Sequence, residues 1–376
     1  MLHWEQQATC GAARRGTLHT DHGTVETPIF MPVGTCGSVK GLTAAQLAET
    51  GSTMILANTY HMLLRPGPET VRELGGLHTM MAWDGPILTD SGGYQVFSLA
   101  HMRKIAENGV TFQSHINGAT VEMTPENVVD TQHILGPDVM MQLDICAASD
   151  ATREEFADAM ETSVRWARQS REAWDERGRV SVQGHSQALF AIQQGGIHAD
   201  LRRESAERLV ELDLPGYAVG GLAIGEGHEV MCNVLDDIDE LLPQTKPRYL
   251  MGVGEPRDIL AAVARGIDMF DCVMPTRNAR NTQAFTWDGR VKMKNAIHTR
   301  DAEPIDSNCG CYACRHYSRG TIRHLFTANE MLAPTLMTIH NLHFFAEFLA
   351  AIRESISAGT FAEDSVRWLE KMYHKA

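Results

Sequence analysis

Three cysteines crowd into six residues in the last third of the sequence: Cys309, Cys311 and Cys314. Thiolates this close together can hold a soft metal ion, and one further Cys or His completes the tetrahedral set that zinc prefers. Such a site is closed and structural. The spacing does not choose among four histidines that follow, which are His316, His324, His340 and His343. The cluster therefore predicts a zinc site, but it does not decide which residue is the fourth ligand.

Two aspartates, Asp90 and Asp271, each end an apolar run and have no basic residue beside them. A pair of carboxylates suits displacement at the anomeric carbon of a sugar, with one as nucleophile and the other as proton donor or acceptor. Either residue, taken alone, is equally well explained as the cap of a turn.

Asp144 and Gln194 form a pair of another kind. A carboxylate accepts hydrogen bonds from the N1 and N2 donors of a guanine-like edge, and an amide can donate to its O6 or N7. The two side chains therefore match the edge of a purine base, although composition does not prove this assignment.

Eight short apolar or β-branched runs bounded by turn residues predict strands, and most are separated by helical patterns. The predicted strands are Pro28 to Thr35, Thr53 to Tyr60, Gly85 to Gly92, Asp138 to Cys146, Leu189 to Gly196, Gly216 to Leu222, Pro247 to Gly254 and Gly266 to Val273. The predicted helices between them include Glu154 to Arg177, Leu201 to Leu212, Val230 to Leu242 and Pro256 to Arg265. This alternation favours a closed (β/α)8 TIM barrel over an open doubly wound sheet.

Several of these strands end in polar or glycine residues. In a parallel barrel the carboxyl ends of all strands share one rim, where active sites are built. Asp90, Asp144, Gln194, Gly221 and Asp271 all follow or end predicted strands. We therefore expect one binding pocket at that rim.

The alternation of strands and helices stops after Val273 and gives way to a basic, Asn-rich and Cys-rich stretch. Helical patterns return at Pro334 to Ser357 and at Phe361 to His374. We expect a barrel core over residues 1–273, a basic zinc-binding subdomain over 274–340, and C-terminal helices packed on the barrel over 341–376.

The formal net charge of −14 argues against indiscriminate nucleic-acid binding. Between Cys272 and His324, however, the sequence has nine Lys or Arg and four acidic residues. The formal net charge of this segment is +5, and that of the rest of the chain is −19. Such a basic sector on an acidic body would steer a polyanion to one face. An ordinary surface with uneven charge explains this segment equally well on its own.

Other classes of protein are disfavoured by the motifs. The glycine-rich stretch from Gly220 to Gly227 lacks the Gly-Lys-Ser/Thr ending of a phosphate loop, and Met251 to Gly254 lacks the third glycine of a dinucleotide fingerprint. No apolar run is long enough to cross a bilayer, and the N-terminus lacks the pattern of a secretion signal. We expect a cytoplasmic protein without a membrane partner.

Taken together, the motifs resemble the bacterial-type tRNA-guanine transglycosylases, also called the queuine tRNA-ribosyltransferase family, over nearly the whole chain. The matching stretches are Leu88 to Phe97 (LTDSGGYQVF), Ile192 to Gly196 (IQQGG), Tyr217 to Leu222 (YAVGGL), Tyr249 to Gly254 (YLMGVG), Met269 to Val273 (MFDCV) and Pro275 to Asn281 (PTRNARN), followed by the cysteine cluster. The resemblance implies a (β/α)8 barrel with an added zinc subdomain, in agreement with the pattern of elements.

The resemblance also implies a role for each matching residue. Asp271 corresponds to the nucleophile and Asp90 to the general acid/base. The base-binding positions correspond to Asp144, Gln194, Gly221 and Leu222, with Tyr94 and Met251 on the two faces of the heterocycle. Arg277 and Arg280 correspond to RNA contacts. The implied ligands of one structural zinc ion per chain are Cys309, Cys311, Cys314 and His340.

The implied reaction exchanges guanine 34 in the anticodon of GUN tRNAs, those for Asp, Asn, His and Tyr, for preQ1 in queuosine biosynthesis. It proceeds by double displacement through a covalent Asp–ribose intermediate, and the enzyme is expected to be a homodimer.

One departure from the family pattern is visible after Asp144. Many members have Glu at the next position, whereas this chain has Ile145 before Cys146. The substitution leaves open a variant that uses queuine instead of preQ1. Two further alternatives are a non-catalytic tRNA-binding partner subunit, which the presence of Asp90 and Asp271 disfavours, and an unrelated barrel glycosidase, which leaves the cysteine cluster unexplained.

Overall fold

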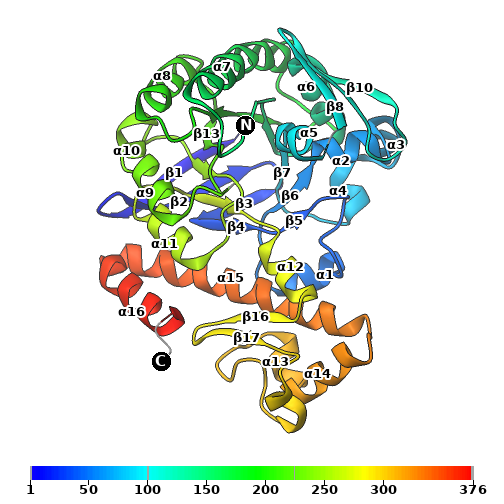
Figure 1. The fold of residues 1–376 in the computed structure, drawn as a ribbon, viewed down its shortest axis with the longest axis vertical. Helices are drawn as coiled ribbons and strands as arrows, with labels where there is room; N and C mark the ends of the chain where they lie inside the picture. Colours follow the sequence, from blue (N-terminus) through cyan, green and yellow to red (C-terminus); the bar gives the residue numbers. More distant parts are fainter. Residues whose placement is uncertain (1, 100, 224, 374–376) are drawn as a thin grey trace.

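The computed structural model describes residues 2–99, 101–223 and 225–373. Its largest sheet is parallel, in the order β4-β15-β14-β13-β12-β11-β7-β6-β5. The outermost members, β4 (Ile29–Met31) and β5 (Val33–Gly34), are two parts of one strand interrupted at Pro32, which has no N–H for the ladder. Because β4 pairs with β15 and β5 pairs with β6, the sheet closes on itself. The predicted (β/α)8 barrel is confirmed (Figure 1).

All eight predicted strand segments overlap observed strands. After β4 and β5 these are β6 (Ile55–Asn58), β7 (Ile87–Asp90), β11 (Val139–Met141), β12 (Ala188–Gln193), β13 (Gly216–Val219), β14 (Arg248–Leu250) and β15 (Met269–Asp271). Each observed strand is shorter than its predicted run, because the polar residues at the carboxyl end leave the ladder and enter the rim loops.

Helices surround the barrel in Figure 1. They are α1 (Ala44–Glu49), α2 (Thr59–Leu64), α3 (Pro68–Glu73), α4 (Gly76–Met81), α5 (Gly93–Leu99), α6 (Pro125–Leu135), α7 (Arg153–Glu176), α8 (Ala199–Val210), α9 (His228–Leu235), α10 (Ile238–Leu241) and α11 (Pro256–Val263). The single helix predicted over Val230 to Leu242 is wrong: it is divided into α9 and α10. Asp236 and Asp237 stand at the break, and Asp competes with the helical backbone for hydrogen bonds and favours caps.

Two three-stranded antiparallel sheets were not predicted. The first comprises β1 (His3–Cys10), β2 (Ala13–Thr20) and β3 (Gly23–Thr27), and it closes the floor of the barrel, since Trp4, Leu18 and Val25 pack with side chains of the barrel interior. The second comprises β8 (His101–Ala106), β9 (Gly109–Gln113) and β10 (Thr120–Met123), inserted after β7 and α5. Both lie outside the strand–helix alternation that guided the prediction.

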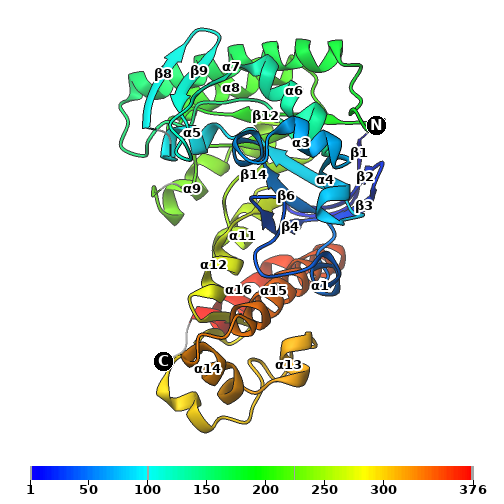
Figure 2. The ribbon, with the colours of Figure 1, turned by 90° about the vertical axis from the view of Figure 1, so that its right-hand side faces the viewer.

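The C-terminal part begins with α12 (Met274–Arg280) and continues with β16 (Gln283–Thr286), β17 (Gly289–Lys292), the 3₁₀ helix η1 (Ala296–Arg300), α13 (Tyr312–His316) and α14 (Arg319–Thr327). Then α15 (Leu332–Ala358) crosses between these elements and the barrel, and α16 (Phe361–Tyr373) ends the described chain (Figures 1 and 2). Both predicted C-terminal helices are confirmed, and His374 lies outside the described residues. The predicted domain boundaries at 273 and 340 stay a prediction, and α15 runs through position 340 without a break.

The long helix α15 contributes to three hydrophobic clusters, one of them through Leu342 alone. Its first half contributes Leu336, Met337 and Ile339 to a cluster with the cysteine region. Its second half contributes Phe344, Phe345, Phe348, Leu349 and Ile352 to the main barrel cluster. Among the described helices none combines the length and apolarity that a bilayer span requires.

A buried ion pair joins the floor sheet to the barrel. Arg14 on β2 contacts Asp268, which precedes β15, and their side chains are 3% and 0% exposed. Arg14 also donates to the carbonyls of Gln244 and Lys246. Burial raises the pKa of Asp268 even beside Arg14, so removing the charge of one partner is the costly change, because it leaves the other buried and unpaired.

We predict that Asp268→Asn lowers the free energy of unfolding by about 3–5 kcal/mol, measured by chemical denaturation. The double variant Arg14→Leu/Asp268→Asn should be less destabilised than this single variant, since no uncompensated charge remains. Asp200→Asn is the matched control, because Asp200 pairs with Arg153 at an exposed site and should cost less than about 1 kcal/mol. A double variant as unstable as the single variant would contradict the explanation.

Candidate active site and metal cluster

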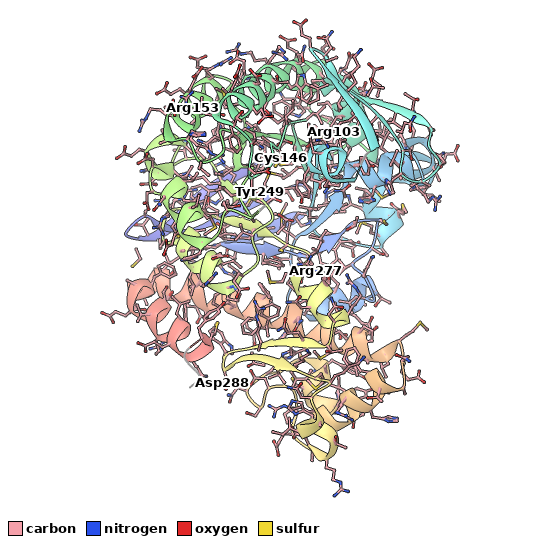
Figure 3. The ribbon with its side chains drawn as sticks, in the orientation of Figure 1. Arg103, Cys146, Arg153, Tyr249, Arg277 and Asp288 are labelled. Carbon is pink, nitrogen blue, oxygen red and sulfur yellow. The ribbon has the colours of Figure 1, made fainter. Side chains whose placement is uncertain are left out.

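A cavity of about 320 Å³ opens at the carboxyl ends of the barrel strands. Its lining includes nearly all the residues that the sequence assigned to the base and the ribose: Asp90, Tyr94, Asp144, Gln194, Gly221, Leu222, Met251 and Asp271, together with Arg277. Figure 3 shows Cys146 and Tyr249, two further lining residues, inside the ring of barrel elements. The rim expected from the strand ends therefore forms one pocket.

Asp271, the last residue of β15, is held through one carboxylate oxygen. The Tyr249 hydroxyl donates to Oδ1 over 2.6 Å, and the Gly252 N–H donates to the same atom over 2.7 Å. Burial raises the pKa of Asp271, while these two hydrogen bonds lower it. The side chain is thus fixed in orientation, with Oδ2 directed away from these donors.

Asp90, the last residue of β7, is fixed by the neighbouring strand end. Thr59 N–H donates to Oδ1 over 3.1 Å, and the Asn58 amide donates to Oδ2. Burial, together with the nearby charge of Asp271, raises the pKa of Asp90 to about 8, although the two hydrogen bonds oppose the rise. At neutral pH this group is mainly a carboxylic acid, which can give up a proton.

Asp144 follows β11 and is bonded on both oxygens. The Ser91 hydroxyl donates to Oδ1 over 3.1 Å, and the Gln194 amide donates to Oδ2 over 2.8 Å. Burial raises the pKa of Asp144 to about 6, and the bonds from Gln194 and Ser91 limit the rise. At neutral pH Asp144 is mainly ionised, so it remains an acceptor for N–H groups.

Glycines make these close approaches possible. A Cβ at Gly93 would lie 2.7 Å from Asp144 Oδ1, and a Cβ at Gly220 would lie 2.6 Å from the Gln194 amide nitrogen. Gly221, where a Cβ would lie 2.7 Å from Gln194 Oε1, has a φ of +71°, which favours glycine. The glycines beside the strand ends thus let the polar side chains pack against backbone.

Arg202 on α8 supports the strand ends from behind. Its guanidinium is buried and donates to the carbonyls of Gln193, Gly196 and Gly220. The sequence did not assign a role to Arg202, Tyr249 or Asn58. Asn58 ends β6, so the rim argument could have found it, whereas nothing in the local sequence shows that Arg202 is buried.

The position that departs from the family pattern points away from the pocket. Ile145 is buried in a hydrophobic cluster with Tyr60, Val96 and Trp166, and its side chain is not part of the cavity lining. The next residue, Cys146, does line the cavity. Position 145 therefore does not contact a base in the pocket directly.

The two thiols in the pocket are not activated. Burial raises the pKa of Cys146 to about 12 and that of Cys272 to about 11. Since the thiolate is the nucleophilic form, the carboxylates are the chemically competent groups here.

Arg277 and Arg280 lie three residues apart on α12 and both are exposed. Arg277 stands at the pocket mouth, between the barrel and β16 (Figure 3). Of the nine basic side chains between 272 and 324, Arg290 and Arg319 are the ones that form ion pairs within the described chain, to Glu255 and Asp301. The other seven are left without an ion pair among the described residues.

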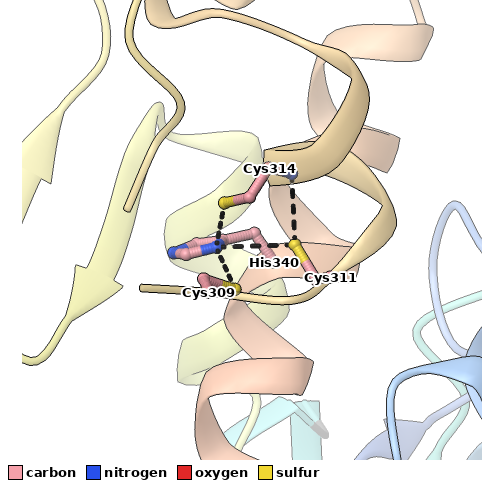
Figure 4. Close-up of side chains that lie close together, drawn as sticks. All are labelled: Cys309, Cys311, Cys314 and His340. Carbon is pink, nitrogen blue, oxygen red and sulfur yellow. Dashed lines mark hydrogen bonds between the residues drawn. The ribbon is translucent and has the colours of Figure 1, made fainter. Parts of the chain in front are cut away.

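The cysteine cluster selects His340 as its fourth member. His340 Nδ1 lies 3.5, 3.8 and 3.3 Å from the sulphurs of Cys309, Cys311 and Cys314 (Figure 4). Bond lengths of a tetrahedral zinc site give a sulphur–nitrogen separation of about 3.6 Å. The four side chains can therefore hold one metal ion.

The orientation of His340 fits that role. Its Nε2 donates to the carbonyl of Phe285 over 2.8 Å, which fixes the tautomer and leaves Nδ1 as the ligand atom. The next residue, Asn341, accepts from the N–H of Phe285 and donates to the carbonyls of Pro275 and Gln283. Together they bind α15 to β16 and α12.

We predict that His340→Ala lowers the metal content of the purified protein to well below one ion per chain and destabilises the region from α13 to β17. Elemental analysis and hydrogen exchange of residues 283–327 measure the two effects. Cys36→Ser serves as the control, because Cys36 is exposed and lies outside the cluster. Full metal occupancy in His340→Ala would contradict the assignment of the fourth ligand.

Comparison with known proteins agrees with this geometry. The model of the family described as queuine tRNA-ribosyltransferase matches residues 9–374. Proteins named queuine tRNA-ribosyltransferase include one from Ruegeria sp. (strain TM1040), 52% identical over 361 residues, which are 96% of this chain and 94% of that protein. Another from Zymomonas mobilis is 51% identical over 353 residues, covering 94% of this chain and 91% of the relative. Both matches extend over the barrel and the cysteine cluster, and the chain belongs to the queuine tRNA-ribosyltransferase family of tRNA-guanine transglycosylase enzymes.

Proposed function

We propose that this chain exchanges guanine 34 of GUN-anticodon tRNAs, those for Asp, Asn, His and Tyr, for preQ1. The observation that carries the proposal is the placement of Asp90 and Asp271 in one cavity with Asp144 and Gln194. Two carboxyl groups stand beside a pair that matches the donor edge of guanine.

Asp271 is the proposed nucleophile. Tyr249 and Gly252 both bond to Oδ1, so we assign the attack on ribose C1′ to Oδ2. In the first displacement the Oδ2–C1′ bond forms and the bond from C1′ to guanine N9 breaks, with its electron pair leaving on the base. In the second, the incoming base bonds to C1′ and the Asp271 ester bond breaks.

Asp90 is the proposed general acid/base. With its pKa raised to about 8, it holds a proton at neutral pH and gives it to the departing guanine. The resulting carboxylate then takes a proton from the incoming base, which restores the starting state. The proton balance of the exchange is thereby closed within one side chain.

Base recognition is assigned to the walls of the cavity. Asp144 accepts from N1 and N2 of the base, and Gln194 donates to its O6, assisted by the backbone of Gly221 and Leu222. Tyr94 and Met251 cover the two faces. Tyr94 is 50% exposed, as expected for a side chain that completes its contacts when a base enters.

The tRNA is proposed to approach over α12. Arg277 at the pocket mouth and Arg280 one turn further along contact the nucleotides beside the exchanged one. Unstacking the target base costs a few kcal/mol and is cheapest in a single-stranded loop, which suits an anticodon. The local excess of basic residues supplies the phosphate contacts.

We assign zinc to the cluster of Cys309, Cys311, Cys314 and His340, one ion per chain, because three thiolates and an imidazole in tetrahedral spacing suit zinc and leave no open position. When bound, the ion has a structural role. We further propose that the enzyme works in the cytoplasm, where its free thiols persist, and as a homodimer.

The three alternative functions are not equally supported. Membership of the family excludes the unrelated barrel glycosidase. A non-catalytic partner subunit remains disfavoured because both aspartates are present and oriented. Use of queuine stays the main alternative, and since Ile145 does not line the cavity, residue 145 does not decide between the two bases through contact.

The proposal predicts that purified protein, given unmodified GUN-anticodon tRNA and preQ1, replaces guanine 34, as detected by mass spectrometry of the anticodon fragment. Asp271→Asn should show no exchange and no covalent tRNA adduct, because an amide cannot form the ester to ribose. Asp175→Asn is a matched control, since Asp175 lies near the C-terminal end of α7, does not line the cavity and pairs with Arg179.

Exchange with queuine alone would keep the mechanism and change the substrate. Protein that binds the tRNA and metal but releases no guanine with preQ1 or queuine would overturn the proposal in favour of a partner subunit.

The rate of guanine release should fall by about tenfold for each pH unit above pH 8, because the first displacement needs the protonated form of Asp90. Single-turnover release of labelled guanine between pH 6 and 10 measures this limb. Asp90→Asn should be slow and independent of pH over the same interval. A falling limb that persists unchanged in the residual activity of Asp90→Asn would assign it to another group.

The same raised pKa has a consequence for stability. Between the ordinary carboxyl pKa and about 8 the folded protein retains a proton that the unfolded chain has released, so stability falls as pH rises through this interval. Asp90→Asn should therefore have a higher free energy of unfolding than the parent at pH 8, by about one to a few kcal/mol. Chemical denaturation at pH 8 and at pH 4 measures the difference, which should shrink towards the lower pH.

A further inference from the structure

Three histidines meet at the floor of the barrel, opposite the rim that carries the active site. His22 lies in the turn between β2 and β3, His78 on α4, and His185 in the segment between α7 and β12. One ring nitrogen from each lies within 4.8 Å of the others. The ring centroids of His22 and His78 are 3.7 Å apart, and that of His185 lies 4.5 Å from that of His22. Three imidazoles from distant segments thus share one small volume.

A buried carboxylate organises two of them. Asp138, whose side chain is 1% exposed, accepts from His22 Nδ1 over 2.8 Å and from His78 Nε2 over 3.2 Å. It also accepts from the Ile87 N–H over 2.9 Å. Burial raises the pKa of Asp138, but the bonds from His78 and His22 outweigh it and lower the pKa overall. The carboxylate is ionised, and each of its oxygens accepts a hydrogen bond from one of the two rings.

These hydrogen bonds fix the tautomers. Since a carboxylate only accepts, a proton sits on Nδ1 of His22 and on Nε2 of His78, so that in the neutral form, which binds metals, the lone pairs lie on His22 Nε2 and His78 Nδ1. His185 Nε2 donates to the carbonyl of Gly136 over 3.0 Å, which places its lone pair on Nδ1, now 3.1 Å from the Ser181 hydroxyl. Each ring therefore offers one unprotonated nitrogen.

Two acids lie beside the three rings. His22 and His78 stack with an interplanar angle of 15°, and both donate to Asp138. Asp21, which accepts from the N–H of Ser186, is the other acid beside His185. Neutral imidazole is the form that binds metal ions.

We propose that His22, His78 and His185 form a second metal site, distinct from the cysteine cluster, that takes a borderline divalent ion such as Zn²⁺, Co²⁺ or Ni²⁺. Three imidazoles with a carboxylate and a backbone carbonyl behind them match the pattern in which outer hydrogen bonds orient metal-binding histidines. The fourth position opens to solvent, since the His22 and His78 side chains are 24% and 14% exposed. An ion there displaces the Ser181 hydroxyl from His185 and requires the stacked rings of His22 and His78 to turn so that their lone pairs converge.

The site lies far from the chemistry. Asp138 immediately precedes β11, and Asp144 follows it, so the two ends are about 20 Å apart at about 3.3 Å per residue. A metal at the floor would instead join the β2–β3 turn, α4 and the segment before β12. Its expected effect is on stability and on attachment of the floor sheet, with base exchange unchanged.

The test uses untagged full-length protein whose cysteine cluster is loaded, dialysed against increasing free Zn²⁺ and analysed for metal per chain. We expect the parent to reach two ions per chain, and His78→Gln and His185→Gln to stop at one. His19→Gln is the matched control, because His19 stacks on His3 in the same floor sheet outside the cluster, and it should also reach two.

Cobalt distinguishes the two sites without relying on any variant. Co²⁺ added to zinc-loaded parent protein should give visible d–d absorption but no thiolate-to-cobalt charge-transfer band, because only nitrogen and oxygen ligands are offered. Zn²⁺ should also raise the melting temperature of the parent, with no such rise in His78→Gln.

A parent protein that takes up no second ion at free Zn²⁺ concentrations below those at which His78→Gln and His185→Gln begin to bind metal non-specifically would overturn the proposal. So would a second ion that survives unchanged in both His78→Gln and His185→Gln. A Ser181→Ala variant that binds the second ion at least as tightly as the parent would support the displacement of its hydroxyl.

Discussion

The main constraint on this molecule is that three carboxyl groups, those of Asp90, Asp144 and Asp271, must be kept close together and away from water. Burial raises the pKa of each, to about 8 for Asp90 and about 6 for Asp144. Placing such groups in one pocket costs folding free energy. A closed barrel can bear that cost, because its strands fix the backbone from which each aspartate projects and every oxygen can be aimed at a chosen donor.

The donors decide what each carboxyl group can do. Asp271 keeps the hydroxyl of Tyr249 and an N–H on a single oxygen, so the other oxygen stays available. Asp144 is bonded on both oxygens by Ser91 and Gln194 and acts as a fixed acceptor. Burial and the charge of Asp271 raise the pKa of Asp90, so that Asp90 keeps its proton at neutral pH. Identical side chains thereby acquire three chemical characters from the strand ends around them.

The barrel and the position of the pocket at its rim could be predicted from the sequence, because both follow from local patterns. Strand–helix alternation requires no knowledge of distant contacts, and the rim rule turns polar strand ends into one site. The floor sheet escaped prediction because its strands pair antiparallel outside that alternation. Arg202 escaped it for a related reason, because its burial depends on packing between segments. The cysteine spacing alone left the fourth ligand open, since His340 lies 26 residues beyond Cys314, and only the family resemblance implied His340. In contrast, Asn58 could have been predicted as a site residue, because it ends a barrel strand at the same rim.

The strand β11 shows how far environment outweighs residue type. Asp138 enters it and Asp144 follows it, both nearly fully buried, yet the pKa of Asp138 is lowered and that of Asp144 is raised. Asp138 receives two imidazole N–H groups and a backbone N–H, which can carry or stabilise charge, whereas Asp144 receives an amide and a hydroxyl. Stronger donation at the floor gives a permanent anion that holds histidines in place. Weaker donation at the rim leaves acceptor capacity for a ligand. The floor end of β11 is therefore suited to holding neighbouring side chains in place, and the rim end is suited to recognising a ligand.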